Sequence, residues 1–228
     1  MKKVMGLIIF IILSNSVIAG VIIDSVNNGT PSKTFIEGKL LKFKTKDFEL
    51  IYNGKSKEFY QINHSQKQVM VITKQDINNF KAMMGNFIAN QQTKTEHYTY
   101  KNIGRKKIAG CTCKGIKVLK NGIATEEIYF CNDKKLLKYI DKNLLKDFEE
   151  MTSFGSHEKS KEMYNSKLLI KYGYPFYIKN LQNGRIEFKV NKVHYKKLGK
   201  NLFTYPTSYE KRSIMNMFNN IPISNFGQ

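Results

Sequence analysis

Short runs of β-forming residues, separated by turn residues, dominate the first third of the chain. In residues 41–46, side chains that suit a covered face alternate with lysines, the period-two pattern of a sheet with one covered face and one face in water. The runs recur at spacings of about eight to ten residues, which predicts an antiparallel meander. They are Thr34–Glu37, Lys39–Lys44, Phe48–Tyr52, Glu58–Ile62 and Gln68–Ile72.

Two stretches with helical periodicity interrupt the strands. Thr73 supplies a hydroxyl at the start of the first stretch, Asp76 supplies a carboxylate in its first turn, and its apolar positions are Ile77, Phe80, Met84, Phe87 and Ile88. Asn132 or Asp133 can cap the second, whose apolar stripe is Leu136, Ile140, Leu144, Phe148 and Met151. Acidic residues dilute the positive charge of its polar face, so we expect it to pack on the protein's own sheet rather than on a membrane.

A polar loop over residues 152–166 precedes the last predicted strands. These are Leu168–Tyr172, Phe176–Asn180, Arg185–Val193 and Leu202–Tyr205. Pro206 ends the last of them, because proline has no amide hydrogen to donate to a neighbouring strand. The chain shows no obvious repeat or linker. The simplest division is therefore one mainly β (α+β) domain over residues 20–210, followed by a polar, flexible tail over residues 211–228.

All three cysteines lie in one predicted hairpin, residues 108–131. A two-residue turn at Asn121-Gly122 would pair no two of them. A three-residue loop, with Gly122 in the left-handed position, would set Cys111 opposite Cys131. A bulge at Gly115 would bring Cys113 into line instead. We expect a disulfide to Cys131 and leave its partner open between the other two cysteines.

Residues 1–19 have the layout of a secretory signal peptide. Two lysines precede an apolar run from Val4 to Leu13, and a small-residue site ends at Ala19. The alternative is a membrane anchor, but this run has about half of the ~20 apolar residues that span a bilayer. We therefore expect cleavage after Ala19 and export of a mature chain without a transmembrane segment. Export also favours a disulfide over three free thiols.

The formal net charge of +20 invites comparison with nucleic-acid-binding proteins. Arg105, Arg185 and Arg212 are, however, the only arginines, and the lysines are spread along the chain. Base recognition and bidentate phosphate binding rely on arginine, so no nucleic-acid partner is expected. The charge is typical of a solvated basic surface, with attraction to anionic lipid or cell-envelope polymers as a second interpretation.

The sequence contains no recognisable catalytic pattern. The four histidines are not at metal-ligand or catalytic spacing, and there is no Gly-x-Ser-x-Gly and no glycine-rich phosphate loop. We predict a non-enzymatic protein without cofactor or metal. One alternative is a copper or redox site, since Cys111 and Cys113 would share a strand face near Cys131 and Cu(I) favours sulfur ligands. A disulfide with one leftover thiol explains the same residues with fewer assumptions.

Two segments resemble a known group of proteins. Residues 107–118, reading KIAGCTCKGIKV, together with Glu127–Phe130 are similar to the hairpin of uncharacterised bacterial periplasmic proteins in the broad superfamily of the lipoprotein carriers LolA and LolB. Residues 198–209, reading LGKNLFTYPTSY, resemble the ending of those families. Cys111 departs from the pattern, because an aromatic residue is usual at that position.

The resemblance implies a strongly curved antiparallel sheet, or incomplete β-barrel, whose concave apolar face is covered by two or three helices that act as a lid. It implies a protein of the Gram-negative periplasm that binds lipid or an acylated protein in this cavity. The helices around Phe80 and Ile140 would form the lid. The predicted ligand-binding residues are Phe80, Met83, Met84, Phe87, Ile140, Leu144 and Phe148. The alternative is a structural or binding protein of the envelope, with a filled core and a basic surface that contacts anionic polymers or a protein partner.

Overall fold

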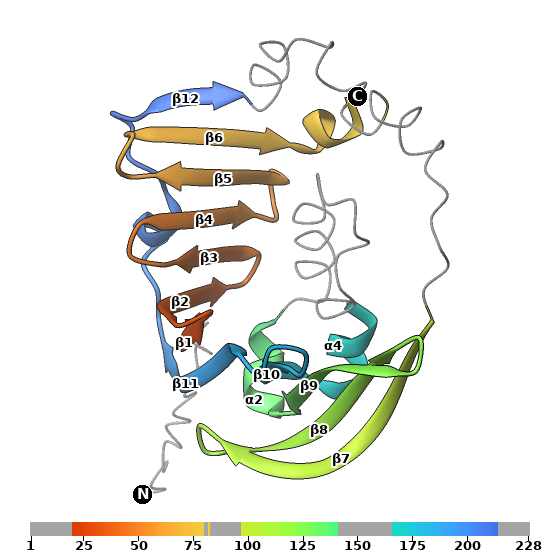
Figure 1. Cartoon of the computed structure of the whole chain (residues 1–228). Helices are drawn as coiled ribbons and strands as arrows, with labels where there is room; N and C mark the ends of the chain where they lie inside the picture. The colour runs from red at the N-terminus through yellow and green to blue at the C-terminus, as the bar shows by residue number, and fades with distance from the viewer. Residues whose placement is uncertain (1–19, 80–81, 83–96, 141–165, 214–228) are drawn as a thin grey trace, which may run out of the picture.

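The computed structural model describes residues 20–79, 82, 97–140 and 166–213. In this part of the chain twelve strands form one sheet, in the order β12-β6-β5-β4-β3-β2-β1-β11-β10-β9-β8-β7. The sheet curves strongly and remains open, because β12 and β7 each have one neighbouring strand (Figure 1). The predicted class, a mainly β protein with a curved and incompletely closed sheet, is confirmed.

The first six strands form a meander in which each strand pairs antiparallel with the next. They are β1 (Gly20–Asn27), β2 (Thr30–Glu37), β3 (Leu40–Lys44), β4 (Phe48–Asn53), β5 (Glu58–Asn63) and β6 (Gln68–Thr73). Strands β2 to β6 confirm the five predicted runs. Their turns use residues that tolerate left-handed backbone, such as Asn28 and Gly29.

The second half of the chain extends the sheet from β1. Its strands are β7 (Tyr98–Ile108), β8 (Cys111–Lys120), β9 (Ile123–Cys131), β10 (Tyr174–Asn180), β11 (Ile186–Lys196) and β12 (Glu210–Ser213). Strand β11 pairs antiparallel with β1 and so joins the two halves. Strand β12 pairs in parallel with β6 at the far edge.

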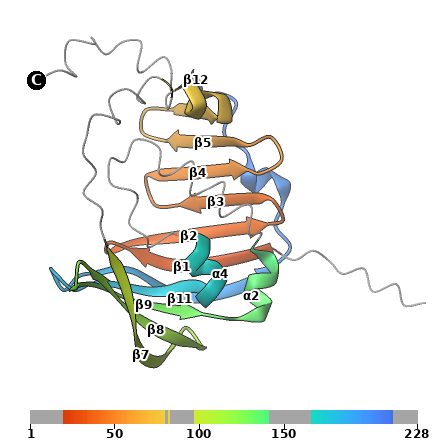
Figure 2. The same ribbon diagram turned by 90° about the vertical axis from the view of Figure 1, so that its right-hand side faces the viewer.

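Short helical segments lie on the inner side of the curve (Figure 2). The first covers residues 74–79 and has the predicted capping box: the Thr73 amide donates to Asp76 Oδ2 over 2.7 Å, and the Asp76 amide donates to Thr73 Oγ1 over 3.1 Å. Helix α2 (Lys134–Tyr139) has Asp133 as its N-cap, as one of the two expected candidates. Helix α4 covers Ser166–Tyr172.

Helix α4 replaces the strand that was expected at Leu168–Tyr172. Leu168 and Leu169 are both buried, whereas Ile170 is 56% exposed. Adjacent residues point to opposite faces in a strand, so a strand would not bury both leucines on one side. The prediction was wrong because three consecutive apolar residues do not distinguish a short buried strand from one turn of a helix.

Apolar side chains cover both faces of the β1–β6 half. On the inner face, strand residues join Leu136 of α2 and Leu168 of α4 in one large hydrophobic cluster. On the outer face, the segment between β11 and β12 crosses the strands and packs Leu198 and Phe203 against Ile51 and Ile62 (Figure 1). Part of this segment, Lys200–Phe203, is the 3-10 helix η2, where a strand was expected. The expectation that one face would lie in water is wrong here.

Burial of the outer face traps an ion pair. Lys42, expected in water, has a side chain only 9% exposed, and its Nζ lies 2.6 Å from Oε2 of Glu49, whose side chain is 5% exposed. The half-exposed Lys44 contacts the other carboxylate oxygen, also at 2.6 Å. Burial alone would raise the pKa of the Glu49 carboxyl, but hydrogen bonds and charge from Lys42 and Lys44 outweigh it and lower that pKa.

Replacing Lys42 with Met is expected to lower the free energy of unfolding by about 3 kcal/mol, because the Glu49 carboxylate would remain buried with one of its two lysine partners removed. Urea denaturation at neutral pH measures the loss. The double variant Lys42→Met/Glu49→Leu removes both charges from the same site. It should recover most of the lost stability, and a double variant no more stable than the single one would contradict this account.

The same pair predicts a pH dependence. The folded-state pKa of Glu49 lies below its ordinary value of 4.5, so its carboxylate stabilises the fold above that value. This contribution is lost as the pH falls through the lower, folded-state pKa. Between about pH 5 and pH 3 the unmodified protein should therefore lose more free energy of unfolding than Lys42→Met/Glu49→Leu does. Equal losses in the two proteins would be the contrary result.

Candidate functional site

The inner face of β3 to β6 changes from apolar to polar along the strands. Cross-strand pairing forms a fully buried row of Leu41, Tyr52, Phe59 and Ile72, each at most 6% exposed. Beside it lies a half-buried row, which we call the inner-face row: Phe43, Leu50, Gln61 and Met70. The next row outward is Phe48, Asn63 and Gln68. On β5 and β6, apolar side chains thus give way to the amides of Asn63 and Gln68 within two rows.

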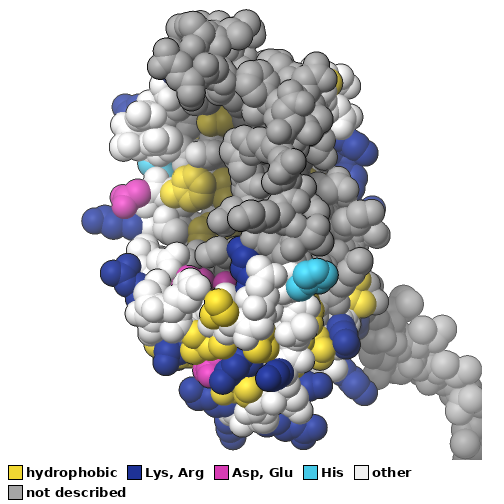
Figure 3. Space-filling model, turned by 45° about the vertical axis from the view of Figure 1, so that its right-hand side comes forward, with side chains coloured by type: hydrophobic (Ala, Val, Ile, Leu, Met, Phe, Trp, Pro, Cys, Tyr) yellow, Lys and Arg dark blue, Asp and Glu magenta, His cyan; other side chains and the backbone are white. Residues whose placement is uncertain are grey.

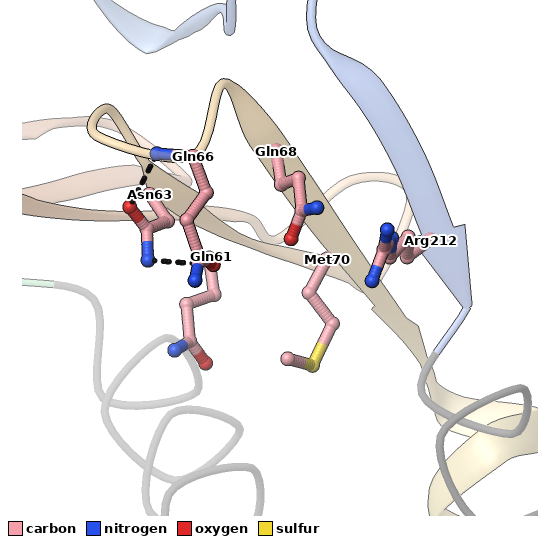
Figure 4. A pocket seen from close by; sticks show the side chains of 6 residues that line it. All are labelled: Gln61, Asn63, Gln66, Gln68, Met70 and Arg212. Atoms are coloured by element: carbon pink, nitrogen blue, oxygen red, sulfur yellow. Dashed lines mark hydrogen bonds between the residues drawn. The ribbon is translucent and has the colours of Figure 1, made fainter. Parts of the chain in front are cut away.

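A pocket of about 350 Å³ opens at the end of this face nearest β12 (Figure 4). Met70 supplies apolar surface, and the other lining residues are Gln61, Asn63, Gln66, Gln68 and Arg212. Arg212 is opposite Met70 in the β12–β6 pair. Its Nε and Nη2 donate to the Glu210 carboxylate over 3.1 and 3.2 Å, which orients the guanidinium and shares its charge. The volume lies within the range of small-ligand sites, and the lining combines one thioether with four amides and a guanidinium.

The space-filling view shows hydrophobic side chains at the surface next to the grey region, and Lys and Arg side chains gathered at the opposite, lower end of the molecule (Figure 3). That lower end corresponds to the β7–β8 side of the sheet in Figure 1. Hydrophobic side chains also reach the surface among the basic ones at this lower end (Figure 3).

One of the predicted ligand-binding residues, Ile140, lies in the described part of the chain. Ile140 lies at the end of α2, is 6% exposed and belongs to the main hydrophobic cluster, and it is not among the pocket residues. The others lie outside the described residues: Phe80, Met83, Met84, Phe87, Leu144 and Phe148.

Sequence reasoning missed Gln61, Met70 and Arg212 as candidates. One signal was available in the sequence. Val69 to Ile72 are all apolar, and adjacent strand residues point to opposite faces, which indicates that both faces of the sheet are covered here. Arg212 gave no local signal, since it reaches the pocket through pairing with a strand more than a hundred residues earlier in the chain.

The cysteine hairpin combines a two-residue turn with a bulge. Asn121 (φ 51°) and Gly122 (φ 84°) are both left-handed, as a type I′ turn requires, and the residues on either side of them pair with each other. Thr125 is then an extra residue in β9, so Cys113 becomes the direct cross-strand partner of Cys131. The three-residue loop does not form, and the bulge lies in the opposite strand from the one considered.

A disulfide joins Cys111 and Cys131, whose Cα atoms are 6.3 Å apart, and confirms the expected bond to Cys131. Cys113 is a buried free thiol, and its S–H donates to the backbone carbonyl of Cys111 over 3.6 Å. The three sulfur atoms all lie within 4.8 Å of one another. Burial raises the pKa of the Cys113 thiol to about 11, so it is protonated at neutral pH.

Two histidines connect segments of the outer face. His64 Nδ1 lies 3.0 Å from the Tyr209 hydroxyl, and the ring's Nε2 lies 3.4 Å from the Glu49 carboxylate. His194 Nε2 lies 2.9 Å from an oxygen of Asp24. The His64 contacts join the β5–β6 turn to Tyr209 and to β4, and the His194 contact joins β11 to β1. Neither histidine lines the pocket.

The edge strand β7 and its neighbour β8 form a basic surface. Residues 97–122 contain no Asp or Glu. Most of the basic side chains in these two strands are exposed: Lys101, Arg105, Lys106, Lys107 and Lys114. Among the described strands β7 pairs with β8 alone, so this charge lies at an edge of the sheet.

Among the helices of the described ranges, none has the length and apolar character needed to cross a bilayer. No curated protein matches the sequence. Similar solved structures include an uncharacterised conserved protein from Thermus thermophilus, with 8% identity, a TM-score of 0.46, and coverage of 86% of this chain and 91% of that one.

MucB is also similar, with 8% identity, a TM-score of 0.39, and coverage of 84% of this chain and 58% of MucB. MucB in the MucA/MucB complex of Pseudomonas aeruginosa gives 9% identity and a TM-score of 0.41, with coverage of 84% and 57%. The chain thus spans somewhat more than half the length of MucB. A family model described as a domain of unknown function, DUF4412, matches residues 40–209. The chain belongs to the DUF4412 family.

Proposed function

We propose that this protein is an exported protein of the bacterial periplasm that holds the acyl chain of a lipid or an acylated protein on the inner face of its sheet. The observation that carries the proposal is the graded inner face. Phe43, Leu50 and Met70 are apolar but only half-buried, and they lead into a pocket rimmed by amides and one arginine. An amphiphile matches this arrangement, because its apolar chain leads to a polar end.

An acyl chain along the inner-face row would gain free energy from desolvation. Each buried methylene contributes about 0.8 kcal/mol, so roughly ten of them supply about 8 kcal/mol before the costs of association. Met70 suits such a ligand because a thioether side chain adapts its shape to different apolar groups. The amides of Gln61 and Asn63 can hydrogen-bond an ester or carboxyl end.

Export is supported by the signal-peptide pattern of residues 1–19 and by the resemblance to periplasmic lipoprotein carriers. The Cys111–Cys131 disulfide is in keeping with an oxidising compartment. The inner-face row and the pocket lining support a ligand with an apolar chain and a polar end.

Replacing Met70 or Leu50 with Glu is expected to weaken binding of a dansyl-labelled fatty acid at least about tenfold, because a carboxylate would have to be desolvated against the acyl chain. Fluorescence titration measures the affinity. Ile123→Glu likewise replaces an apolar residue with Glu, at the exposed start of β9, where the side chain is 66% exposed, and it should bind as the unmodified protein does. Circular dichroism confirms that the variants are folded. A folded Met70→Glu protein with unchanged affinity would refute the assignment.

The alternative function, contact with an anionic partner through a basic surface, is favoured by one observation. The β7–β8 surface combines an open strand edge with a segment that contains no acidic residue. Such a surface attracts anionic lipid headgroups or envelope polymers through its summed charge.

If that surface binds, Lys101→Glu/Lys107→Glu should lose most of the binding to phosphatidylglycerol vesicles, and binding by the unmodified protein should disappear at about 0.5 M salt. Vesicle sedimentation measures the bound fraction. The control Lys46→Glu/Lys55→Glu changes the net charge equally at exposed positions in the β3–β4 and β4–β5 turns. Equal losses in the two double variants would show that overall charge, rather than this surface, controls binding.

A further inference from the structure

Three sulfur atoms from different parts of the β8–β9 hairpin meet within 4.8 Å of one another. Cys111 and Cys113 are two residues apart on β8 and therefore share a face, and Cys131 is opposite Cys113 on β9. Cys113 and Cys131 are fully buried, and Cys111 is half-buried. The bulge at Thr125 brings the third cysteine into line. A single structural disulfide needs only two of these residues.

We propose that Cys111, Cys113 and Cys131 form a Cu(I)-binding site when the disulfide is reduced. Cu(I) selects soft thiolate ligands over nitrogen and oxygen donors. Three sulfur atoms placed at about 2.3 Å around one ion would lie about 4 Å apart. The separations between Cys113 and the other two sulfur atoms, at most 4.8 Å, are within about 1 Å of this value, and the sulfur atoms of Cys111 and Cys131 must move apart once the bond between them is reduced. A structural zinc site takes four ligands, and the metal-ligand cluster in the described part of the chain consists of these three cysteines.

The surroundings offset the charge of such a site. Three thiolates with one Cu(I) carry a net charge of −2. Lys106 on β7 is the direct cross-strand partner of Cys113, so its side chain leaves the sheet on the same face. Its Nζ lies 5.0 Å from the centre of the Tyr177 ring and 5.7 Å from that of Tyr129. The absence of acidic residues from 97–122 adds to the favourable potential.

The disulfide makes the site conditional on reduction. In the oxidised protein Cys111 and Cys131 are bonded to each other, and only Cys113 is a thiol. A dithiol reductant supplies two electrons and two protons, is itself converted to a disulfide, and leaves three thiols. Cu(I) then replaces the thiol protons as the three sulfur atoms bind, so affinity increases with pH. This inference is independent of the acyl-chain proposal.

The test is an anaerobic Cu(I) titration in competition with bicinchoninate, with protein that is either oxidised or reduced by a dithiol. The reduced protein should bind one Cu(I) per chain with high affinity, and the oxidised protein should not. Cys113→Ser retains the residues of the disulfide. When reduced, it should bind Cu(I) at least about tenfold more weakly, since even outer-sphere changes at metal sites cost 10–100-fold.

Thermal unfolding of the reduced protein provides a second measurement. Cu(I) bound to the folded site should raise the unfolding midpoint of the reduced protein and leave that of reduced Cys113→Ser nearly unchanged. The proposal is overturned if the oxidised protein binds equally well, or if reduced Cys113→Ser matches the unmodified protein. It is also overturned if the reduced chain is unfolded and Cu(I) does not restore its fold.

Discussion

The fold depends on covering both faces of an open sheet. Strands β1 to β6 carry apolar side chains on both faces, so neither face can lie in water. The chain meets this requirement with helices on the inner side and, on the outer side, with the segment that carries Leu198, Phe203 and Tyr209. The outer cover also explains the buried Lys42–Glu49 pair, because a lysine on a covered face needs a counter-charge. The inner-face row and the pocket lie where the apolar side chains of the inner face are only partly buried.

An open sheet also has two edges, and the chain protects them in different ways. Strand β12 is only four residues long and includes Glu210 and Arg212. Strand β7 is eleven residues long, but it is rich in lysine and has an irregular register at Gly104, which has a φ of 94°. Short length, charge and bulges all prevent edge-to-edge aggregation. The basic charge of β7 therefore has a structural reason of its own, besides any anionic partner, and the same lysines stand beside the cysteine cluster.

Local features of the fold were predictable from the sequence, and nonlocal ones were not. The strands of the first half, the Thr73–Asp76 capping box and the Asp133 cap follow from residue preferences within a few positions. Helix α4 was mistaken for a strand because a short apolar run fits both structures. The outer cover and the parallel β12–β6 pair join segments that are far apart in the chain, so no local pattern indicated them. The alternation of Lys42 with apolar neighbours was real, but it could not show that this face would also be covered.

The two candidate sites differ in how far local sequence could reveal them. The spacing of Cys111 and Cys113 places both on one strand face, so a cysteine cluster was foreseeable, although the bulge that aligns Cys131 was not. The pocket, in contrast, requires Gln61, Met70 and Arg212 from three strands, and the last of these joins through a contact that only the complete fold creates. The sites also lie toward opposite ends of the strand order, one by β12 and the other by β7. Because they share no residue, ligand binding on the inner face and sulfur chemistry in the hairpin are physically separable properties of one sheet, and a variant that removes one leaves the residues of the other in place.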